Sequence, residues 1–155
     1  PMDSSVGLVT YEEVVDLPGF TKAQLYEQTG KWADEYFTNP TRVIKEREPE
    51  KGKYTGKHQF HVYSEDKRGN RTKTDLIKFT FKIWLKDGKY RYKISEFNVE
   101  KTSYYAIERW LTNEHLSNKL VMGYLNQIND EILKMIESLH EGLKKTEVEV
   151  DEDDW

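Results

Sequence analysis

Two alternating runs of residues around Asp87-Gly88 constrain the fold of this chain more than any other feature of its sequence. Residues 75–97 read DLIKFTFKIWLKDGKYRYKISEF, and Asp-Gly is a preferred pair for a two-residue turn between antiparallel strands. A turn at this pair fixes the register of the hairpin. The apolar face, extended by Ile77 and Phe79, then pairs Leu85 with Tyr90, Ile83 with Tyr92 and Phe81 with Ile94; the other face pairs Trp84 with Arg91, Lys82 with Lys93 and Thr80 with Ser95.

Three further segments have the alternation or the composition of strands. Residues 7–19 are predicted to form a strand, and a slip in its alternation near Glu12-Glu13 suggests a bulge. Residues 41–48 are a short strand candidate, and residues 53–64 are predicted to form a strand with one apolar face. The polar segment 65–74 is predicted to be a loop and the most flexible point of the domain.

Two segments have the period of amphipathic helices. Residues 21–37 begin with Thr21 as a potential N-cap and Gln24 three residues later, which is the pattern of a capping box. A second helix is predicted from about Leu120, where apolar residues recur at helical spacing. The aromatic side chains of the first helix are expected to cover a sheet rather than to line a ligand pocket.

The order of these elements is strand, helix, about four antiparallel strands and a long helix. Because the strands have an apolar face and both helices are amphipathic, we predict one α+β domain, a single antiparallel sheet with two helices packed on one face. The opposite face is left to solvent, a ligand or a partner. The domain is expected to span residues 1–146, and the acidic residues 147–155 are predicted to be a disordered tail.

The bulk composition excludes several classes of function. The chain has 155 residues, the size of one domain, and no cysteine, which removes disulfides, thiolate metal sites and a cysteine nucleophile. No apolar run approaches the ~20 residues of a membrane-spanning helix. The chain opens with Pro1-Met2, so we expect that an upstream segment such as an export signal has been removed.

The charge is distributed unevenly along the chain. The net charge is −4, yet residues 42–93 hold 16 Lys and Arg against 7 Asp and Glu, and the remainder holds 8 against 21. The middle of the chain therefore carries +9 and the rest −13. Such asymmetry is typical of an anion-binding middle or of a dipolar domain that stays soluble.

Residues 9–37, VTYEEVVDLPGFTKAQLYEQTGKWADEYF, share a pattern with a known family. The pattern is a strand ending in Val-x-x-Pro-Gly, followed by Lys-x-x-Leu-Tyr and a tryptophan, here Val15, Pro18, Gly19, Lys22, Leu25, Tyr26 and Trp32. Gly56-Lys57 and the hairpin residues 86–92 extend it. Over about residues 8–98 the chain resembles the uncharacterised domains with a TBP-like fold found mainly in Bacteroidetes. The resemblance implies a TBP-like fold in β-α-β-β-β-β-α order and, often, export to the bacterial envelope; it carries no catalytic residue across.

The polar face of the predicted sheet is the first candidate site. It carries basic and aromatic side chains from the hairpin and the neighbouring strand: Lys57, His61, Lys78, Lys82, Trp84, Arg91 and Lys93. Lys82 opposite Lys93 is unfavourable in a sheet, and a bound anion would relieve that cost. Trp84 beside Arg91 could stack on a ring or a base. The alternative is a solvated face on which the stem of Arg91 shields Trp84.

Signatures of metal binding and catalysis are absent from the sequence. His58 and His61 point to opposite faces of a strand, and neither HExxH nor Gly-x-Ser-x-Gly occurs. Glu96 falls opposite Phe79 on the apolar face by register, so we expect either a buried acid or a bulge there. We therefore expect no enzyme, no metal and no cofactor. Nucleic acid is disfavoured as a partner because the whole protein is acidic.

These features predict a non-enzymatic binding or interaction module of the bacterial cell envelope that uses its basic, aromatic sheet face. Its partner is expected to be a protein or an anionic ligand. The alternative is a carrier of a small apolar ligand, with a cavity between the sheet and the C-terminal helix lined by Tyr11, Trp32, Tyr90 and Tyr92. A cavity of roughly 300 Å3 or more would favour the carrier, whereas a filled core would favour the surface.

Overall fold

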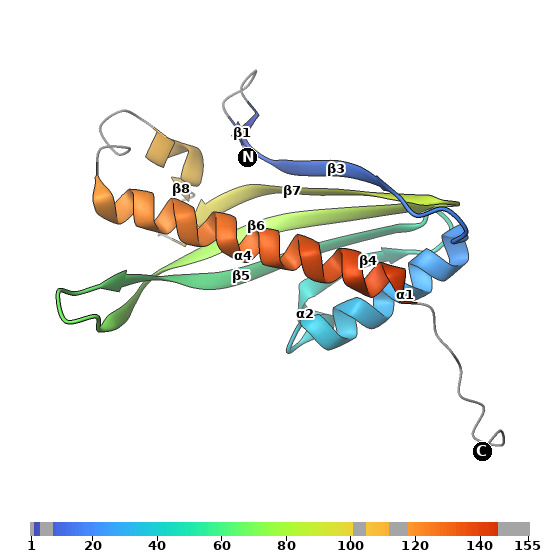
Figure 1. The fold of residues 1–155 in the computed structure, drawn as a ribbon, viewed down its shortest axis with the longest axis horizontal. Helices are drawn as coiled ribbons and strands as arrows, with labels where there is room; N and C mark the ends of the chain where they lie inside the picture. Colours follow the sequence, from blue (N-terminus) through green and yellow to red (C-terminus); the bar gives the residue numbers. More distant parts are fainter. Residues whose placement is uncertain (1, 4–7, 101–104, 112–117, 146–155) are drawn as a thin grey trace, which may run out of the picture.

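The computed structural model of the chain describes residues 2–3, 8–100, 105–111 and 118–145. The predicted elements appear in the predicted order, and short strands and helices are added before and between them (Figure 1). They are β1 (Met2–Asp3), β2 (Leu8–Val9), β3 (Tyr11–Asp16), α1 (Lys22–Tyr36), α2 (Pro40–Val43), β4 (Ile44–Glu48), β5 (Lys53–Glu65), β6 (Arg71–Lys86), β7 (Lys89–Val99), β8 (Tyr105–Ala106), the 3-10 helix η1 (Ile107–Leu111) and α4 (Lys119–Lys144). The predicted tail, residues 147–155, lies outside the described residues.

The main sheet is antiparallel, with strand order β3-β7-β6-β5-β4, and β8 pairs with the end of β7. The strands β1 and β2 form a separate two-stranded sheet. The hairpin register predicted from Asp87-Gly88 is confirmed for all six pairs. Gly88 has a φ of 77°, a conformation that this turn requires and that glycine adopts without strain.

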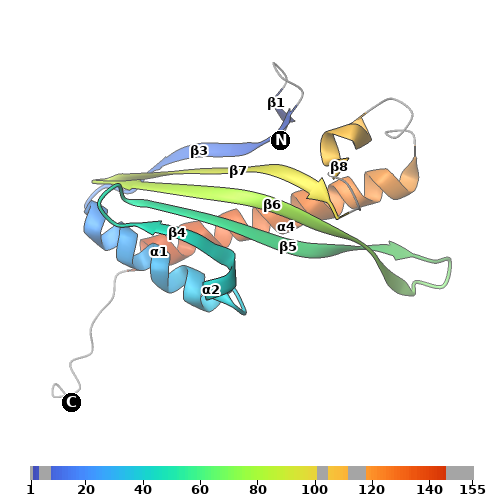
Figure 2. The same ribbon diagram turned by 180° about the vertical axis from the view of Figure 1, so that it is seen from behind.

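Helices α1 and α4 both pack on one face of the main sheet, as the opposite views in Figures 1 and 2 show. This confirms the predicted α+β arrangement. α1 begins with the expected capping box, because Thr21 Oγ1 accepts a hydrogen bond from Gln24 N and Gln24 Oε1 accepts one from Thr21 N. Its aromatic side chains belong to the core: Trp32 is buried and stacks on Tyr36 with ring centres 5.3 Å apart.

The bulge predicted in the first strand is wrong. β3 pairs with β7 from Tyr11 to Asp16 without a shift in register. The alternation is regular: Tyr11 and Glu13 lie toward the helices, and Glu12 lies on the opposite face. The apparent slip in the sequence arises because Glu13 is a polar residue on the helix side, where its carboxylate accepts a hydrogen bond from the Tyr92 hydroxyl at 3.0 Å.

A bulge instead interrupts β7. Between the pairs Lys78–Asn98 and Thr80–Ser95, the two residues Glu96 and Phe97 of β7 stand opposite one residue of β6. Glu96 has a φ of 58° and is exposed. The extra residue turns Phe97 onto the covered face, where it is fully buried. Of the two expectations for Glu96, the bulge is therefore confirmed and the buried acid is not.

Half of the polar segment 65–74 is strand, which corrects the predicted loop. β5 extends to Glu65 and β6 begins at Arg71, so only residues 66–70 form the turn. The two strands project beyond the rest of the sheet as an arm (Figure 1). Polar composition hid these strands because their side chains are exposed, and the backbone pairing of the arm needs no apolar face.

The candidate strand 41–48 is divided between two elements. α2 begins after the N-cap Asn39 and ends at Val43, and β4 follows directly. The proline after Asn39 starts this short helix rather than only ending α1. Among the described residues, no helix is long and apolar enough to cross a membrane.

Candidate binding surface on the open sheet face

The face of the main sheet that α1 and α4 leave uncovered is called the open face below. Its side chains form rows across the strands, because directly opposite residues of antiparallel strands lie side by side. The rows are Glu48–Lys53–Trp84–Arg91–Val14, Glu46–Thr55–Lys82–Lys93–Glu12, Lys57–Thr80–Ser95 and Gln59–Lys78–Asn98. Six of the seven predicted residues fall in these rows. The seventh, His61, is opposite Leu76, one step further along β5 toward the arm.

Trp84 is enclosed between two cations. The Lys53 ammonium lies 5.6 Å from the centre of its ring, and the Arg91 guanidinium lies 4.5 Å from it. Arg91 Nε also donates a hydrogen bond to Glu12 Oε1 at 3.0 Å. Arg91 is thus satisfied within the protein, and its contact with Trp84 is the shielding that the solvated-face alternative expects.

Lys82 and Lys93 face each other directly, as predicted. Neither makes an ion pair with another residue of the described segments. Acids stand only at the two ends of their row, Glu46 and Glu12. Two adjacent positive charges therefore occupy the centre of the open face, and their repulsion costs the sheet stability.

A hollow of about 830 Å3 opens where β4 stops covering β5. The pairing of β4 with β5 ends at Gly56. From Lys57 onward, no other strand of the described residues pairs with this side of β5, so β5 itself is the edge of the sheet. This hollow, called the edge hollow, joins the third and fourth rows of the open face to the α2 segment. It is lined by the cations Arg42, Lys45, Lys57 and Lys78, the acid Glu96, the polar residues Thr38, Asn39, Gln59, Thr80 and Asn98, and by Val43, His58 and Phe79.

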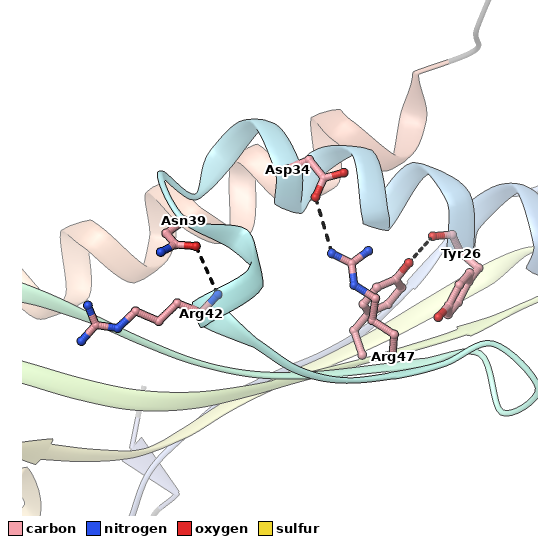
Figure 3. Close-up of polar contacts among 6 residues, drawn as sticks. Tyr26, Asp34, Asn39, Arg42 and Arg47 are labelled. Atoms are coloured by element: carbon pink, nitrogen blue, oxygen red, sulfur yellow. Dashed lines mark hydrogen bonds and ion pairs between the residues drawn. The ribbon is translucent and has the colours of Figure 1, made fainter.

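Most of the positive charge in the edge hollow is unpaired. Arg42, Lys45 and Lys57 have no ionic partner among the described residues, whereas Lys78 Nζ lies 3.2 Å from Glu100 Oε1. Figure 3 shows the contrast between two neighbouring arginines. Arg47 reaches Asp34 at 3.5 Å, whereas the side chain of Arg42 extends away from α1 and has no bonded partner among the described residues. The backbone N–H of Arg42 donates to Asn39 O at 3.1 Å and to Asn39 Oδ1 at 3.4 Å.

The sequence pattern pointed to Lys57 and Lys78 but held no signal for the other half of the edge hollow. Arg42 and Lys45 lie in α2 and β4, which are placed beside β5 only when the chain folds. No local sequence pattern therefore marks these two residues as neighbours of Lys57. Asn98 would lie on the covered face if β7 were regular, and only the bulge at Glu96 places it on the open face.

The four aromatic residues predicted to line a carrier cavity are packed in the core. All four are at most 5% exposed, and their polar atoms are bonded. The Tyr11 hydroxyl donates to Asn129 Oδ1 at 2.8 Å, Trp32 Nε1 donates to Ser138 Oγ at 3.0 Å, the Tyr92 hydroxyl donates to Glu13, and the Tyr90 hydroxyl lies 2.7 Å from His140 Nδ1. Burial raises the pKa of Tyr11 and of Tyr92 to about 12. A second hollow of about 340 Å3, between α1 and α4, touches Trp32 but none of the three tyrosines.

The histidines are separated in space. His58 packs on the covered face against Phe37, with ring centres 4.7 Å apart, and burial lowers its pKa, so it is a neutral core side chain at pH 7. His61 is exposed on the other face. Across the described segments, no three His, Asp or Glu side chains are grouped as ligands for a metal ion.

The arrangement of sheet and helices has close counterparts among solved structures. A TBP-like protein from Parabacteroides distasonis superposes with a TM-score of 0.74 over 95% of this chain and 98% of its own, at 16% identity. A DUF4468 family protein from Bacteroides ovatus superposes with a TM-score of 0.72 over 96% and 92%, at 18% identity. At such identities the likeness shows the fold alone.

Residues 11–100 match the family described as a domain of unknown function (DUF4468) with TBP-like fold. The chain belongs to this family. The match confirms the resemblance predicted over about residues 8–98, and the two structures extend the likeness of fold beyond the DUF4468 match. No curated protein sequence matches the chain.

Proposed function

We propose that this DUF4468 domain is a non-enzymatic binding module of the bacterial cell envelope whose open face takes an anionic ligand. The observation that carries the proposal is the direct pairing of Lys82 with Lys93. Like charges opposite each other destabilise a sheet, and the described residues place no ion-pair partner on either lysine. A bound anion between them would turn this repulsion into attraction.

The charge layout supports the same surface. Residues 42–93, which carry +9, contain β4, β5, β6 and the hairpin half of β7. Much of this positive charge projects from the open face, because the opposite face of these strands is buried under the helices. A basic face on an acidic protein attracts anions locally while the whole molecule repels dense polyanions at long range.

The packed interior favours the surface over the carrier. Tyr11, Tyr90 and Tyr92 are buried and hydrogen-bonded, so an apolar ligand would have to displace these contacts to enter. The envelope location rests on the family resemblance. Fractionation of cells that make the protein from its native gene tests it, and recovery only in the cytoplasm would contradict this part of the proposal.

A thermal-shift screen tests the open face. The domain is mixed with anionic glycans, nucleotides, anionic lipids or short nucleic acids, and a ligand at 100 times its Kd should stabilise it by about 2.7 kcal/mol. The same screen is run on Lys82→Glu/Lys93→Glu. The matched control is Lys119→Glu/Lys134→Glu, which changes the net charge equally but on exposed positions of α4.

A shift that is lost in the open-face variant and kept in the α4 variant is the expected result. A thermal shift that is kept in both variants would mean that the ligand binds elsewhere, and it would favour the alternative of a small-molecule carrier. The absence of a thermal shift with every compound would argue against a small anionic ligand. Affinity capture from envelope extracts would then test for a protein partner.

A further inference from the structure

We infer that the edge hollow is the specific subsite of the open face and that it takes an acidic sugar, a saccharide unit carrying a carboxylate or a phosphate group. The inference rests on the proposed function and adds to it the place and the ligand class. The hollow, at about 830 Å3, lies within the roughly 300–1,000 Å3 range of small-molecule sites.

Three unpaired cations that line the edge hollow come from three different elements. Arg42 comes from α2, Lys45 from β4 and Lys57 from β5, and none has an ionic partner among the described residues. A guanidinium presents parallel N–H groups that match the two oxygens of a carboxylate or phosphate. The unpaired Arg42 in Figure 3 is the natural anchor for such a group.

Neutral polar groups fill the rest of the wall. The amide nitrogen of Asn98 donates to the backbone oxygens of Glu96 and Lys78, at 3.0 and 3.5 Å, which orients the amide and leaves its oxygen without a partner among the described residues. Gln59 and Asn39 add further amides. Such donors and acceptors suit the hydroxyl groups of a sugar.

The aromatic rings near the edge hollow do not suit a nucleobase. Phe79 is 3% exposed and stacks on Phe97 with ring centres 5.5 Å apart, and His58 packs against Phe37 and Phe79. Trp84 belongs to another row and does not line the hollow. Single-stranded nucleic acids and nucleotides bind on open ring faces, which this lining does not offer.

Glu96 narrows the ligand class further. Among the described residues it is the one acid that lines the edge hollow, and the bulge holds it exposed at a φ of 58°. A carboxylate here accepts hydrogen bonds from hydroxyl groups but repels a second closely spaced anion. The lining therefore fits a sugar with one acidic group among several hydroxyls better than a densely charged polyanion.

Isothermal titration calorimetry tests the inference with three named probes of one sugar: glucuronate, glucose 6-phosphate and neutral glucose. A comparison of the affinities for the two acidic probes shows whether the hollow prefers a carboxylate or a phosphate group. The hollow variant is Arg42→Gln/Lys57→Gln, and the matched variant is Lys82→Gln/Lys93→Gln, which removes the same charge from the centre of the open face. Thermal unfolding without ligand verifies that each variant is folded, and the single variant Lys45→Gln serves if the double variant is not.

We expect an acidic probe to bind and glucose to bind at least about tenfold more weakly, because a charge-assisted hydrogen bond contributes about 1.5 kcal/mol or more. The hollow variant should lose at least about a hundredfold in affinity, because it removes two charge-assisted contacts. The centre variant should lose about tenfold, because it removes two neighbouring positive charges without removing a direct contact of the sugar. Equal losses in both variants, or a larger loss in the centre variant, would overturn the inference while leaving the proposed function standing. Failure of both acidic sugars to bind would also overturn it, whereas the proposed function would still be judged by its own screen.

Discussion

Gly56 shows how one residue without a side chain lets two layers of the protein meet. It lies on the covered face of β5 opposite Phe81, whose ring occupies the space of the absent side chain. A Cβ at Gly56 would lie 2.6 Å from Phe81 Cε1, and Phe81 cannot retreat because it is fully buried and stacks on Phe37. In the sequence this glycine was only part of a family pattern, and the structure supplies its packing reason.

Replacement of Gly56 by alanine should therefore lower the free energy of unfolding by about 1–3 kcal/mol, the usual cost of overpacking a core. Gly123 is the matched control, because a Cβ there meets nothing within 4 Å and α4 should gain about 0.8–1 kcal/mol from alanine. Urea unfolding followed by circular dichroism measures both. A Gly56→Ala protein as stable as the wild type would mean that Phe81 does not lie over this glycine.

At the scale of elements, the bulge in β7 decides which side chains face which way. Side chains alternate along a strand, so one extra residue exchanges the faces of everything that follows it. Without the bulge, Phe97 and Val99 would point to solvent, whereas both are now buried. The same shift places Asn98 in the edge hollow. One residue thus completes the core and the candidate site together.

The bulge also predicts an order of stability at position 96. A positive φ costs a residue with a side chain about 1–2 kcal/mol relative to its usual conformations, and β-branched residues suffer most. Glu96→Gly should raise the free energy of unfolding by up to about 1 kcal/mol after glycine's own entropy cost, and Glu96→Val should lower it. Thermal unfolding of the three proteins gives the order, and a valine variant as stable as the glycine variant would argue against this backbone conformation.

At the scale of the whole molecule, residues 42–93 supply most of the strands of the main sheet and many of its basic side chains. One face of these strands is buried in the core, so their charged side chains gather on the open face. The protein therefore concentrates like charges on the open face, most clearly at Lys82 and Lys93. Function and stability are often opposed at binding sites, because charges placed for a ligand repel one another when it is absent.

The change Lys82→Glu should accordingly stabilise the free protein by about 0.2–1 kcal/mol, because it places an opposite charge beside Lys93. Lys82→Gln should gain less, since it removes the repulsion without adding attraction. Urea unfolding at low salt and at 1 M NaCl measures the effect, which should shrink at high salt through screening. A loss of stability in Lys82→Glu at low salt would show that the lysine pair is not under strain.

Much of the fold was predictable because its signals are local. The Asp87-Gly88 turn set the hairpin register, and Thr21 with Gln24 marked the start of α1. The arm of β5 and β6 was missed because its residues are exposed and lack an apolar face. Glu13 misled the prediction of a bulge in β3, because a polar side chain on the helix side resembles a break in alternation.

The sequence by itself determined the main strands and the two long helices, the register of the central hairpin, the face that the helices cover and the family. The elements, the register and the covered face follow from turn chemistry or from periodicity within a few residues, whereas the family follows from the resemblance of its residue pattern. Only the tertiary structure decided that Arg42 and Lys45 line one hollow with Lys57. It also chose between alternatives that the sequence had left open, because it shields Trp84 between Lys53 and Arg91 and places Glu96 in a bulge rather than in the core. These features depend on where β4 leaves the edge of β5 and on how Phe97 fills the core, and such packing between distant segments has no local pattern in the chain.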